Sequence, residues 1–421
     1  MRVAAACNRL LALPGATVRE VSSGPAQITV TVALRRRRLA CADCSYSSRA
    51  RYDTRTMDSR WRHLDLGRWR LVIKANLRRI VCPTHGVRTE GVPSARAESG
   101  FTRDFEDLVA WLATRMDKSA VRRLVRVAWQ TVGATCQRVV ADELGPGRLD
   151  GLSEVGIDEV SWRKGHRDLT LVTDHRSGKI VWGSEGKDTA TCDRFFADLG
   201  EQRSAQLTAI STDMGPAFLK SLAKPAHAPR ATVCTDPSHV VALATDALGQ
   251  VRRQVWDQLR AVGPDKAKTF KGARWVLLKR PGRLSEAQAA TLRKLRRQGG
   301  AAWRAYGLKE ALREVFAGDL TPSQTTELLD RWCVKAARSR LEPSVTLAGT
   351  IRKHRDGILA AIRLGINNAR VEALNNKVRL ITRRAYGFHS AQAALALVML
   401  ACGPITLRLP HEQTHVRPHS A

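Results

Sequence analysis

Three acidic residues lie where their side chains could take part in metal-dependent chemistry. Asp158 lies in VGIDEV and Asp213 in LTAISTDMG, each within or just after a short β-branched run typical of a buried strand. Glu372 lies in NNARVEALNNKVRL, a stretch with helical spacing and many Asn and Arg residues. Carboxylates collected in this way are suitable ligands for two Mg²⁺ or Mn²⁺ ions that activate oxygen atoms in phosphodiester chemistry.

Each of these acids also has a structural interpretation. Aspartates at strand ends commonly occupy turns or helix caps, so Asp213 could cap the helix that follows it. Glu372 could pair with Arg370 or Arg379 on a solvated helix. An acid among the buried-strand residues around Asp158 is costly unless a cation compensates its charge. The three settings together favour a metal site more strongly than any one acid does.

A second set of residues has the spacing of a zinc site. Cys41 and Cys44 form one pair, Cys82 and His85 form another, and two residues separate the members of each pair. A turn with this spacing lets both side chains reach one ion. The set predicts one structural Zn²⁺ with three Cys ligands and one His ligand. The alternative is that these cysteines are incidental in a basic β-rich region.

The composition indicates a polyanionic partner. The chain of 421 residues has 70 Lys and Arg against 39 Asp and Glu, a formal net charge of +31. Residues 35–79 hold 14 basic and 4 acidic residues, and residues 251–310 hold 16 and 4, so two stretches supply +22 of the charge. Nucleic acid is the expected partner, because clustered Arg side chains suit phosphates. An arginine-rich codon bias is the alternative for part of the excess.

Other features predict a cytoplasmic protein without a membrane partner. No run of about 18 apolar residues is present. Asn8 and Arg9 interrupt the apolar opening segment, which argues against a secretory signal. Nine cysteines, an odd number, favour a reducing compartment over a disulfide framework.

The first two segments are expected to be a β-rich zinc-binding domain and a helical DNA-binding region. Residues 1–98 contain a strand over 26–34 and two further strands in WRHLDL and WRLVIKANLRRIVC. Residues 101–145 contain three helices with a break near 127–130, which fits a helix-turn-helix; a plain helical hairpin is the alternative. Four residues are predicted to face DNA: Gln130, Thr131, Thr135 and Arg138.

The remaining segments are expected to hold an α/β domain and several helices. Residues 152–262 give three strands, a helix, a strand, a helix, a strand and a long helix, the order of a ribonuclease-H-like domain. In that order the first and fourth strands bring carboxylates to neighbouring positions. Residues 263–345 are basic and helical, 346–402 are helical, and 403–421 are expected to form a disordered tail.

Several segments carry a resemblance to a known family. They are LLALPG (10–15), the basic strand leading to Cys41 and Cys44, CPTHG (82–86), GIDE (156–159), TDMGPAF (212–218), TDPSHVV (235–241) and NARVEALNNKVRLITRRAYGFHS (368–390). Through them, nearly the whole chain resembles bacterial insertion-sequence DDE transposases of the ISL-three family.

The resemblance implies a multidomain transposase. Asp158, Asp213 and Glu372 would bind the two Mg²⁺ (or Mn²⁺) ions in a ribonuclease-H-like catalytic core that cleaves and joins DNA. The zinc-binding region and the helix-turn-helix would recognise the terminal inverted repeats. His85 departs from the Cys that the family commonly has at the fourth zinc position. The 158 residues between Asp213 and Glu372 imply that 263–345 is an α-helical insertion in the core, whose C-terminal helices follow in 346–402.

The resemblance implies roles for further residues. Asp236 and His239 match an Asp-x-x-His element of insertion-bearing transposases: His239 could steer DNA near the metals, or pack at a helix start that Asp236 caps. Asp236 is also the reserve ligand for Asp213. Residues one turn after Glu372 could hold the scissile phosphate, and more distant ones could grip the backbone, with a solvated basic helix as the alternative. These residues are Asn375, Asn376 and Lys377, then Arg383, Arg384 and Tyr386.

The implied partners are double-stranded DNA, both transposon ends and target, and a second copy of the chain, because two ends must be joined. A homodimer or larger assembly on the nucleoid is therefore expected. Two other functions stay open: a catalytically inactive zinc-containing DNA-binding regulator, and a structure-specific nuclease. The intact triad argues against the regulator, and the two N-terminal DNA-binding candidates make end recognition more natural than structure-specific cutting.

Overall fold

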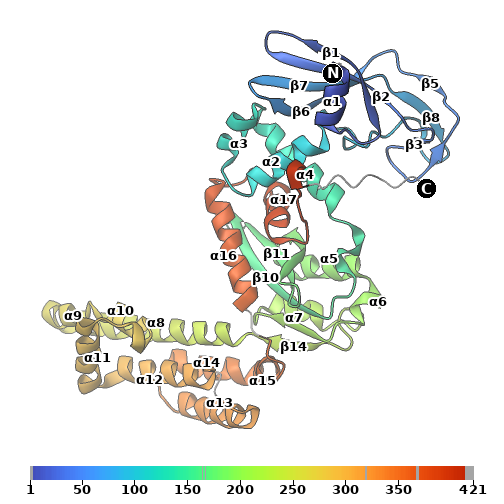
Figure 1. The fold of residues 1–421 in the computed structure, drawn as a ribbon. Coiled ribbons are helices and arrows are strands. Elements are labelled where there is room, and N and C mark those ends of the chain that lie inside the picture. Colours follow the sequence, from blue (N-terminus) through green and yellow to red (C-terminus); the bar gives the residue numbers. More distant parts are fainter. Residues whose placement is uncertain (1–2, 164, 166, 318–319, 367–368, 413–421) are drawn as a thin grey trace. The chain divides into compact units, whose positions relative to one another are not determined.

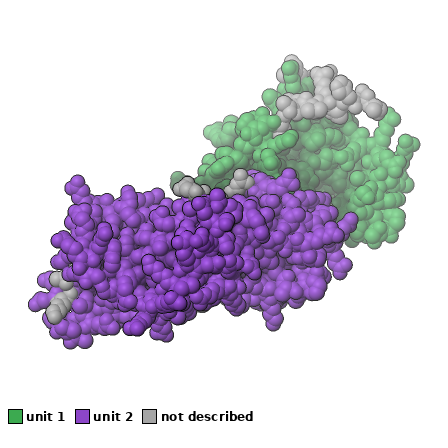
Figure 2. Space-filling view, turned by 90° about the horizontal axis from the view of Figure 1, so that it is seen from below, with its two compact units in different colours: residues 1–148, 162–164, 377–421 green, residues 149–161, 165–376 purple. Residues whose placement is uncertain are grey.

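The chain forms two compact units, neither of which is continuous in sequence. The computed structural model describes residues 3–163, 165, 167–317, 320–366 and 369–412. Unit 1 comprises residues 1–148, 162–164 and 377–421, and unit 2 comprises residues 149–161 and 165–376 (Figures 1 and 2). Within the described ranges, no helix combines the length and the apolar character that crossing a bilayer requires.

Unit 1 begins with a four-stranded sheet in the order β1-β2-β7-β6 (Figure 1). Strands β2 and β7 are parallel, and the other two pairs are antiparallel. Alternate residues such as Val30, Val32 and Ile73 are buried, as expected of a sheet with one face on a core. The elements are α1 (Val3–Leu11), β1 (Ala16–Ser23), β2 (Gln27–Leu34), β6 (Ser59–Leu66) and β7 (Trp69–Ala75).

Two smaller sheets surround the Cys and His pairs. They are β3 (Leu39–Ala40) with β4 (Ser47–Ser48), and β5 (Asp53–Thr54), β8 (Arg78–Cys82) and β9 (Gly86–Thr89). The single strand predicted for WRLVIKANLRRIVC is wrong, because the chain changes sheets after Ala75 and forms β7 and β8 separately. Residues 76 and 77 make this change, with Leu77 buried under the first sheet.

A helical layer completes unit 1. Thr102 and Asp117 cap α2 and α3 with their side chains, and Arg126 ends α3 in the left-handed region at φ 55°. The apolar faces of α2 and α4 pack with Ala396 and Leu400 of α17 in one core. The bounds are α2 (Arg103–Ala113), α3 (Lys118–Val125), α4 (Trp129–Glu143), the 3₁₀ helix η1 (Pro146–Leu149) and α17 (Ala391–Cys402).

Unit 2 is built on a five-stranded sheet in the order β12-β11-β10-β13-β14. The central strand β10 is parallel to β13, which is parallel to β14, whereas β11 and β12 are antiparallel. Val155, Ile157 and Phe195 belong to the core that the sheet shares with α5 and α7. The strands are β10 (Glu154–Arg163), β11 (Arg167–Asp174), β12 (Lys179–Glu185), β13 (Ala209–Thr212) and β14 (Thr232–Thr235). The helices are α5 (Thr189–Leu199), α6 (Glu201–Ser204) and α7 (Pro216–Leu222).

Every described element from residue 237 to 363 is helical. A core of apolar side chains joins these helices, and Trp332 Nε1 donates to the carbonyl of Leu308 at 2.8 Å within it. The bounds are α8 (Pro237–Val262), α9 (Pro264–Phe270), α10 (Ala273–Leu278), η2 (Pro281–Arg283), α11 (Glu286–Gln298), α12 (Gly300–Val315), α13 (Pro322–Ala337), α14 (Glu342–Lys353) and α15 (Arg355–Arg363).

The chain ends with α16 (Ala369–Arg384), α17 and a short 3₁₀ helix, η3 (Pro410–Glu412). The division between the units falls inside α16, after Asn376. Residues 413–421 of the predicted disordered tail lie outside the described residues.

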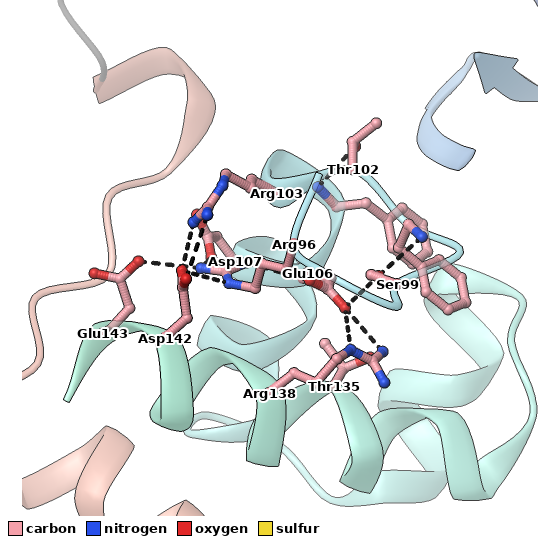
Figure 3. A network of polar contacts seen from close by, with 12 residues as sticks. Arg96, Ser99, Thr102, Arg103, Glu106, Asp107, Thr135, Arg138, Asp142 and Glu143 are labelled. Carbon is pink, nitrogen blue, oxygen red and sulfur yellow. Dashed lines mark hydrogen bonds and ion pairs between the residues drawn. The ribbon is translucent and has the colours of Figure 1, made fainter. Parts of the chain in front are cut away.

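A buried ionic network holds the helical layer of unit 1 to the segment that precedes it (Figure 3). Arg96 is 3% exposed, and its guanidinium contacts four carboxylates on α2 and α4. Glu106, completely buried, also accepts from Ser99 Oγ and Arg138 Nε, each at 2.8 Å. The four carboxylates lie 2.7 to 3.3 Å from Arg96 and belong to Glu106, Asp107, Asp142 and Glu143.

Replacing the central cation should destabilise unit 1 strongly. Arg96→Met keeps most of the side-chain volume but leaves several carboxylates, one of them fully buried, without their main partner. Breaking a buried ion pair in this way costs about 3–5 kcal/mol. The nearby Arg103 pairs with Asp142 at the surface, so Arg103→Met should cost less than about 1 kcal/mol. Equal losses for the two variants in urea unfolding would contradict this account.

Candidate active site and DNA-binding elements

Two of the predicted catalytic acids lie side by side at one edge of the unit 2 sheet. The parallel ladder pairs Ile157 of β10 with Thr212 of β13, so Asp158 and Asp213 follow the last paired residues of the two strands. Thr212 pairs in turn with Thr235 of β14, which places Asp236 next in the same row. Three parallel strands therefore each have an aspartate directly after the last residue of the parallel ladder, and Asp158 itself lies within β10, which continues to Arg163.

The electrostatics of these acids reflect burial and mutual repulsion. Burial raises the pKa of Asp158 above its usual value, and the negative charge of Asp213 adds to the rise. The neighbouring Glu159 has its pKa raised to about 7 by burial together with the charges of Asp213 and Asp158. A raised pKa means that the surroundings disfavour the negatively charged form of the carboxyl group. A cation bound at this edge would stabilise that charged form.

Helix α16 packs directly on the strand that carries Asp158. A Cβ added at Gly156 would lie 2.8 Å from Cγ2 of Val371, so only glycine permits this approach. One turn later, Asn375 Nδ2 donates to Asp158 Oδ2 at 2.5 Å. Asn375, which is 5% exposed, therefore orients the Asp158 carboxylate, and its contact with the scissile phosphate stays a prediction.

Glu372 is exposed on the first turn of α16. It lines a hollow of about 730 Å³ together with Asp236, the last aspartate of the row; Asp158 and Asp213 are not among the lining residues. Within the part of the chain that the structure describes, however, the ligand atoms of Asp158, Asp213 and Glu372 do not form one compact metal-binding group. Asp158, Asp213 and Glu372 thus lie in one region of unit 2, but their carboxylates are not close enough together to bind one ion jointly.

Asp236 and His239 make structural contacts at the beginning of α8. Asp236 is 3% exposed and caps the helix by accepting from Ser238 N at 2.9 Å and from the Ser238 hydroxyl. His239 Nε2 lies 3.7 Å from Asp236 Oδ2, and its charge lowers the pKa of Asp158 against the effect of burial. Asp213 is half-buried and accepts from the backbone N–H of Gly215 in its own turn, at 2.9 Å.

The three cysteines and His85 converge in unit 1. All four candidate ligand atoms lie within 4.8 Å of one another, with Cys44 Sγ and Cys82 Sγ 3.6 Å apart and Cys82 Sγ and His85 Nδ1 3.5 Å apart. Burial acts to raise the pKa of Cys82, but hydrogen bonds from the backbone N–H groups of His85 and Thr84 outweigh it and bring that pKa to about 6. A ready thiolate in a compact set of three sulfurs and one nitrogen fits a tetrahedral Zn²⁺.

The four residues of α4 that were predicted to face DNA differ in their exposure. Gln130 is exposed and Thr131 is half-buried at the first turn. Thr135 is completely buried, so its prediction as a surface residue is wrong: it lies in the apolar stripe with Val132 and Val139. Arg138 is held by the buried Glu106 in the network of Figure 3.

The polar residues on α16 and just after it that were predicted to contact DNA differ in their contacts. Lys377 Nζ donates to the carbonyl of Ala401 at 2.6 Å, and Arg384 Nη2 donates to the carbonyl of Thr114 at 2.7 Å. These two side chains therefore tie the end of α16 to other helices of unit 1. Asn376, Arg383 and Tyr386 are exposed.

Sequence reasoning missed Glu159 as a functional residue. It belongs to the GIDE segment, and a second acid directly after Asp158 in a buried strand is itself a signal of accumulated negative charge.

Comparisons with known proteins agree with this architecture. Residues 155–397 match a family model described as "Transposase", and residues 90–140 match "Helix-turn-helix domain of transposase family ISL3". The transposase for insertion sequence element IS1557 of Mycobacterium tuberculosis is 40% identical over 385 residues, 86% of each chain. The transposase for insertion sequence element IS1001 of Bordetella parapertussis is 26% identical over 356 residues, 84% of this chain and 86% of that protein.

The helix-turn-helix and the acidic sheet domain together define a DNA transposase of the DDE type. The chain belongs to the ISL3 (ISL-three) family of insertion-sequence transposases.

The metal site in unit 1 can be tested by changing one ligand. Purified full-length protein should contain about one zinc per chain, and His85→Ala should lose most of it because three thiolates remain in an open site. His85→Cys should retain zinc, since a fourth sulfur completes the tetrahedron. Cys7→Ser, remote from the cluster, serves as the control. Unchanged zinc in His85→Ala, measured by elemental analysis, would contradict the assignment.

The acidic edge predicts a specific pH dependence for the metal-free protein. Because the folded-state pKa of Glu159 is raised from 4.5 to about 7, the protonated form is favoured by folding. Its contribution to stability is present below about pH 4.5 and is lost as the pH rises through about 7. Glu159→Gln should therefore raise the melting temperature at pH 8 without metal, and have a smaller effect at pH 5. The exposed Glu201→Gln is the control; an equal response of both variants would count against charge crowding at the edge.

Proposed function

We propose that the protein is a metal-dependent transposase that binds the terminal inverted repeats of an insertion sequence, cleaves a phosphodiester at each end and joins the freed 3′-hydroxyl to target DNA. The observation that carries this proposal is the placement of Asp158 and Asp213 at equivalent positions on adjacent parallel strands, with α16 packed on Gly156 of the same strand. The family membership supplies the type of reaction.

The sheet order supports a ribonuclease-H-like core. Two antiparallel strands at one edge and three parallel strands from the centre to the other edge correspond to the strand order expected from the sequence. On this proposal the core comprises residues 152–262 and 346–402, and the helices of 263–345 are an insertion. Residues 1–98 and 101–145 are the zinc-binding and helix-turn-helix regions.

The catalytic triad of the proposal is Asp158, Asp213 and Glu372. When bound, two Mg²⁺ or Mn²⁺ ions would activate the attacking oxygen and stabilise the leaving oxygen. Asp158 and Asp213 provide adjacent carboxylates whose repulsion a cation relieves, and Glu372 provides a third from α16. Asn375 fixes the orientation of the Asp158 carboxylate by donating to Oδ2. Asp236 already caps α8, so the proposal treats it only as an alternative metal ligand to Asp213.

DNA recognition is assigned to the exposed beginning of α4. The second helix of a helix-turn-helix places its N-terminal residues against base edges in the major groove. Gln130 and Thr131 lie in that turn, whereas Thr135 and Arg138 support the helix from its buried side. A dimer or larger assembly is part of the proposal, since one reaction must hold two DNA ends.

A strand-transfer assay tests the proposed function. With Mg²⁺, duplexes bearing the element's terminal repeats and a target plasmid, wild-type protein should cleave and join. Asp158→Asn and Asp213→Asn should reduce joining at least about 1,000-fold, because each removes a charged ligand of the reacting centre, while DNA binding persists. Glu201→Gln, an exposed acid on α6, should be fully active.

Each alternative function gives a different result in that assay. Cleavage without joined product would indicate a nuclease, and binding without either reaction would indicate a regulator. Joining that survives Asp158→Asn would overturn the assigned triad.

A further inference from the structure

A basic hollow lies where the N-terminal sheet meets the helix-turn-helix in unit 1. It has a volume of about 730 Å³ and is lined by residues of β7, α3 and the turn before α4. Four of its seven lining residues are arginines, and none is acidic. They are Arg70, Ser119, Arg122, Arg123, Arg126, Val127 and Ala128.

Three of the four arginines have no counter-charge in the hollow. The side chains of Arg70, Arg122 and Arg123 are exposed and make no hydrogen bond or ion pair with other residues that the structure describes. Arg126 is paired with Asp65, whose carboxylate also accepts from Arg62, so that acid is already shared. Positive charges gathered in one concavity repel one another unless an anion enters.

The hollow borders the beginning of the recognition helix. Ala128 is the N-cap of α4 and provides no side-chain cap, so the first backbone N–H groups of a 15-residue helix lack that partner. The partial positive charge at this helix end adds to the field of the arginines. Both features favour the same kind of ligand, an oxyanion.

The walls of the hollow are tied together. Arg126 Nη1 donates to the carbonyl of Arg68 at 2.8 Å, and the same guanidinium pairs with Asp65, so the turn between α3 and α4 is fixed to the β6–β7 hairpin. Arg70 lies two residues after Arg68 on β7. The sheet arginine and the helix arginines are therefore held as one surface.

We propose that this hollow binds consecutive backbone phosphates of DNA beside the recognition helix, so that the N-terminal sheet takes part in DNA binding through Arg70. The proposal rests on the DNA-binding role proposed above and adds a second element to it. Phosphate contacts fix the position of a protein on the duplex without reading sequence. The clamp would thus hold the duplex while Gln130, two residues beyond the hollow, lies against the bases.

The salt dependence of DNA binding tests the clamp. Full-length Arg70→Gln, Arg122→Gln and Arg123→Gln proteins are titrated with a duplex carrying the terminal repeat and with a scrambled duplex of equal length. Each variant should reduce the slope of log affinity against log salt by about 0.9 for each phosphate that it no longer neutralises. The reduction should be equal on both duplexes, because phosphates carry no sequence information.

Arg19→Gln is the matched control. Arg19 is an exposed arginine on β1 of the same sheet, outside the hollow, so the variant makes the same change in net charge. An Arg70→Gln slope equal to that of Arg19→Gln would overturn the clamp, as would an effect confined to the terminal-repeat duplex. Zinc content and thermal unfolding should match the wild type in all four variants.

Strand transfer separates the clamp from the proposed function. At saturating protein and low salt, the control Arg19→Gln should join DNA as well as the wild type, whereas Asp158→Asn should bind with an unchanged slope and not join. If the wild type joins DNA and the slopes of Arg70→Gln, Arg122→Gln and Arg123→Gln are unchanged, the clamp alone is refuted. Reduced slopes in a protein that never joins DNA would support the clamp and refute the transposase reaction.

Discussion

The repulsion between the carboxylates of Asp158 and Asp213, where the parallel pairing of β10 with β13 ends, is the constraint on which the rest of unit 2 depends. A parallel ladder leaves no freedom in the relative positions of Asp158 and Asp213, because the register of Ile157 and Thr212 fixes them. The surrounding structure offsets this crowding only partly, through the amide of Asn375 and the imidazole of His239. The acidic edge thus keeps negative charge that its own neighbours neutralise only in part.

In unit 1, by contrast, the buried negative charges are paired with arginines of the same unit. There the carboxylates of α2 and α4 are satisfied internally by Arg96, and Glu106 receives three donors although it is fully buried. Such a network fixes one arrangement of the helices, because any shift would leave a buried charge without a partner. The network therefore makes rigid the part of unit 1 that matches the helix-turn-helix family model.

Local patterns in the sequence are sufficient to predict most elements but not their tertiary contacts. The strand at 26–34, the three helices of 101–145 and the central position of β10 follow from periodicity and strand order. The change of sheets after Ala75 does not, because an uninterrupted β-prone run carries no mark of which partner each half will pair with. The hydroxyl of Thr135 suggests an outward position, although helical spacing puts it on the stripe of Val132 and Val139.

The candidate site, too, could be predicted from the sequence only in part, because its tertiary contacts are not encoded locally. The acids are identifiable from their settings, yet the contact of Asn375 with Asp158 joins residues 217 positions apart, and nothing local distinguishes Asn375 from Asn376. The role of Gly156 likewise becomes visible only when Val371 is seen against it. Partners of this kind depend on how α16 packs, which no short segment encodes.

The contribution of α17 to the core of unit 1 bears on how the protein is made. Ala396 and Leu400 fill the apolar faces of α2 and α4, and they are synthesised only after the residues of unit 2, which lie between these helices in the sequence. Until they arrive, the helical layer has an open apolar side, so a chain that stops early presents an incomplete DNA-binding unit. A premature stop anywhere between α4 and α17 would therefore leave this core unfilled, so the helix-turn-helix region reaches its finished form only after the residues of unit 2 have been synthesised.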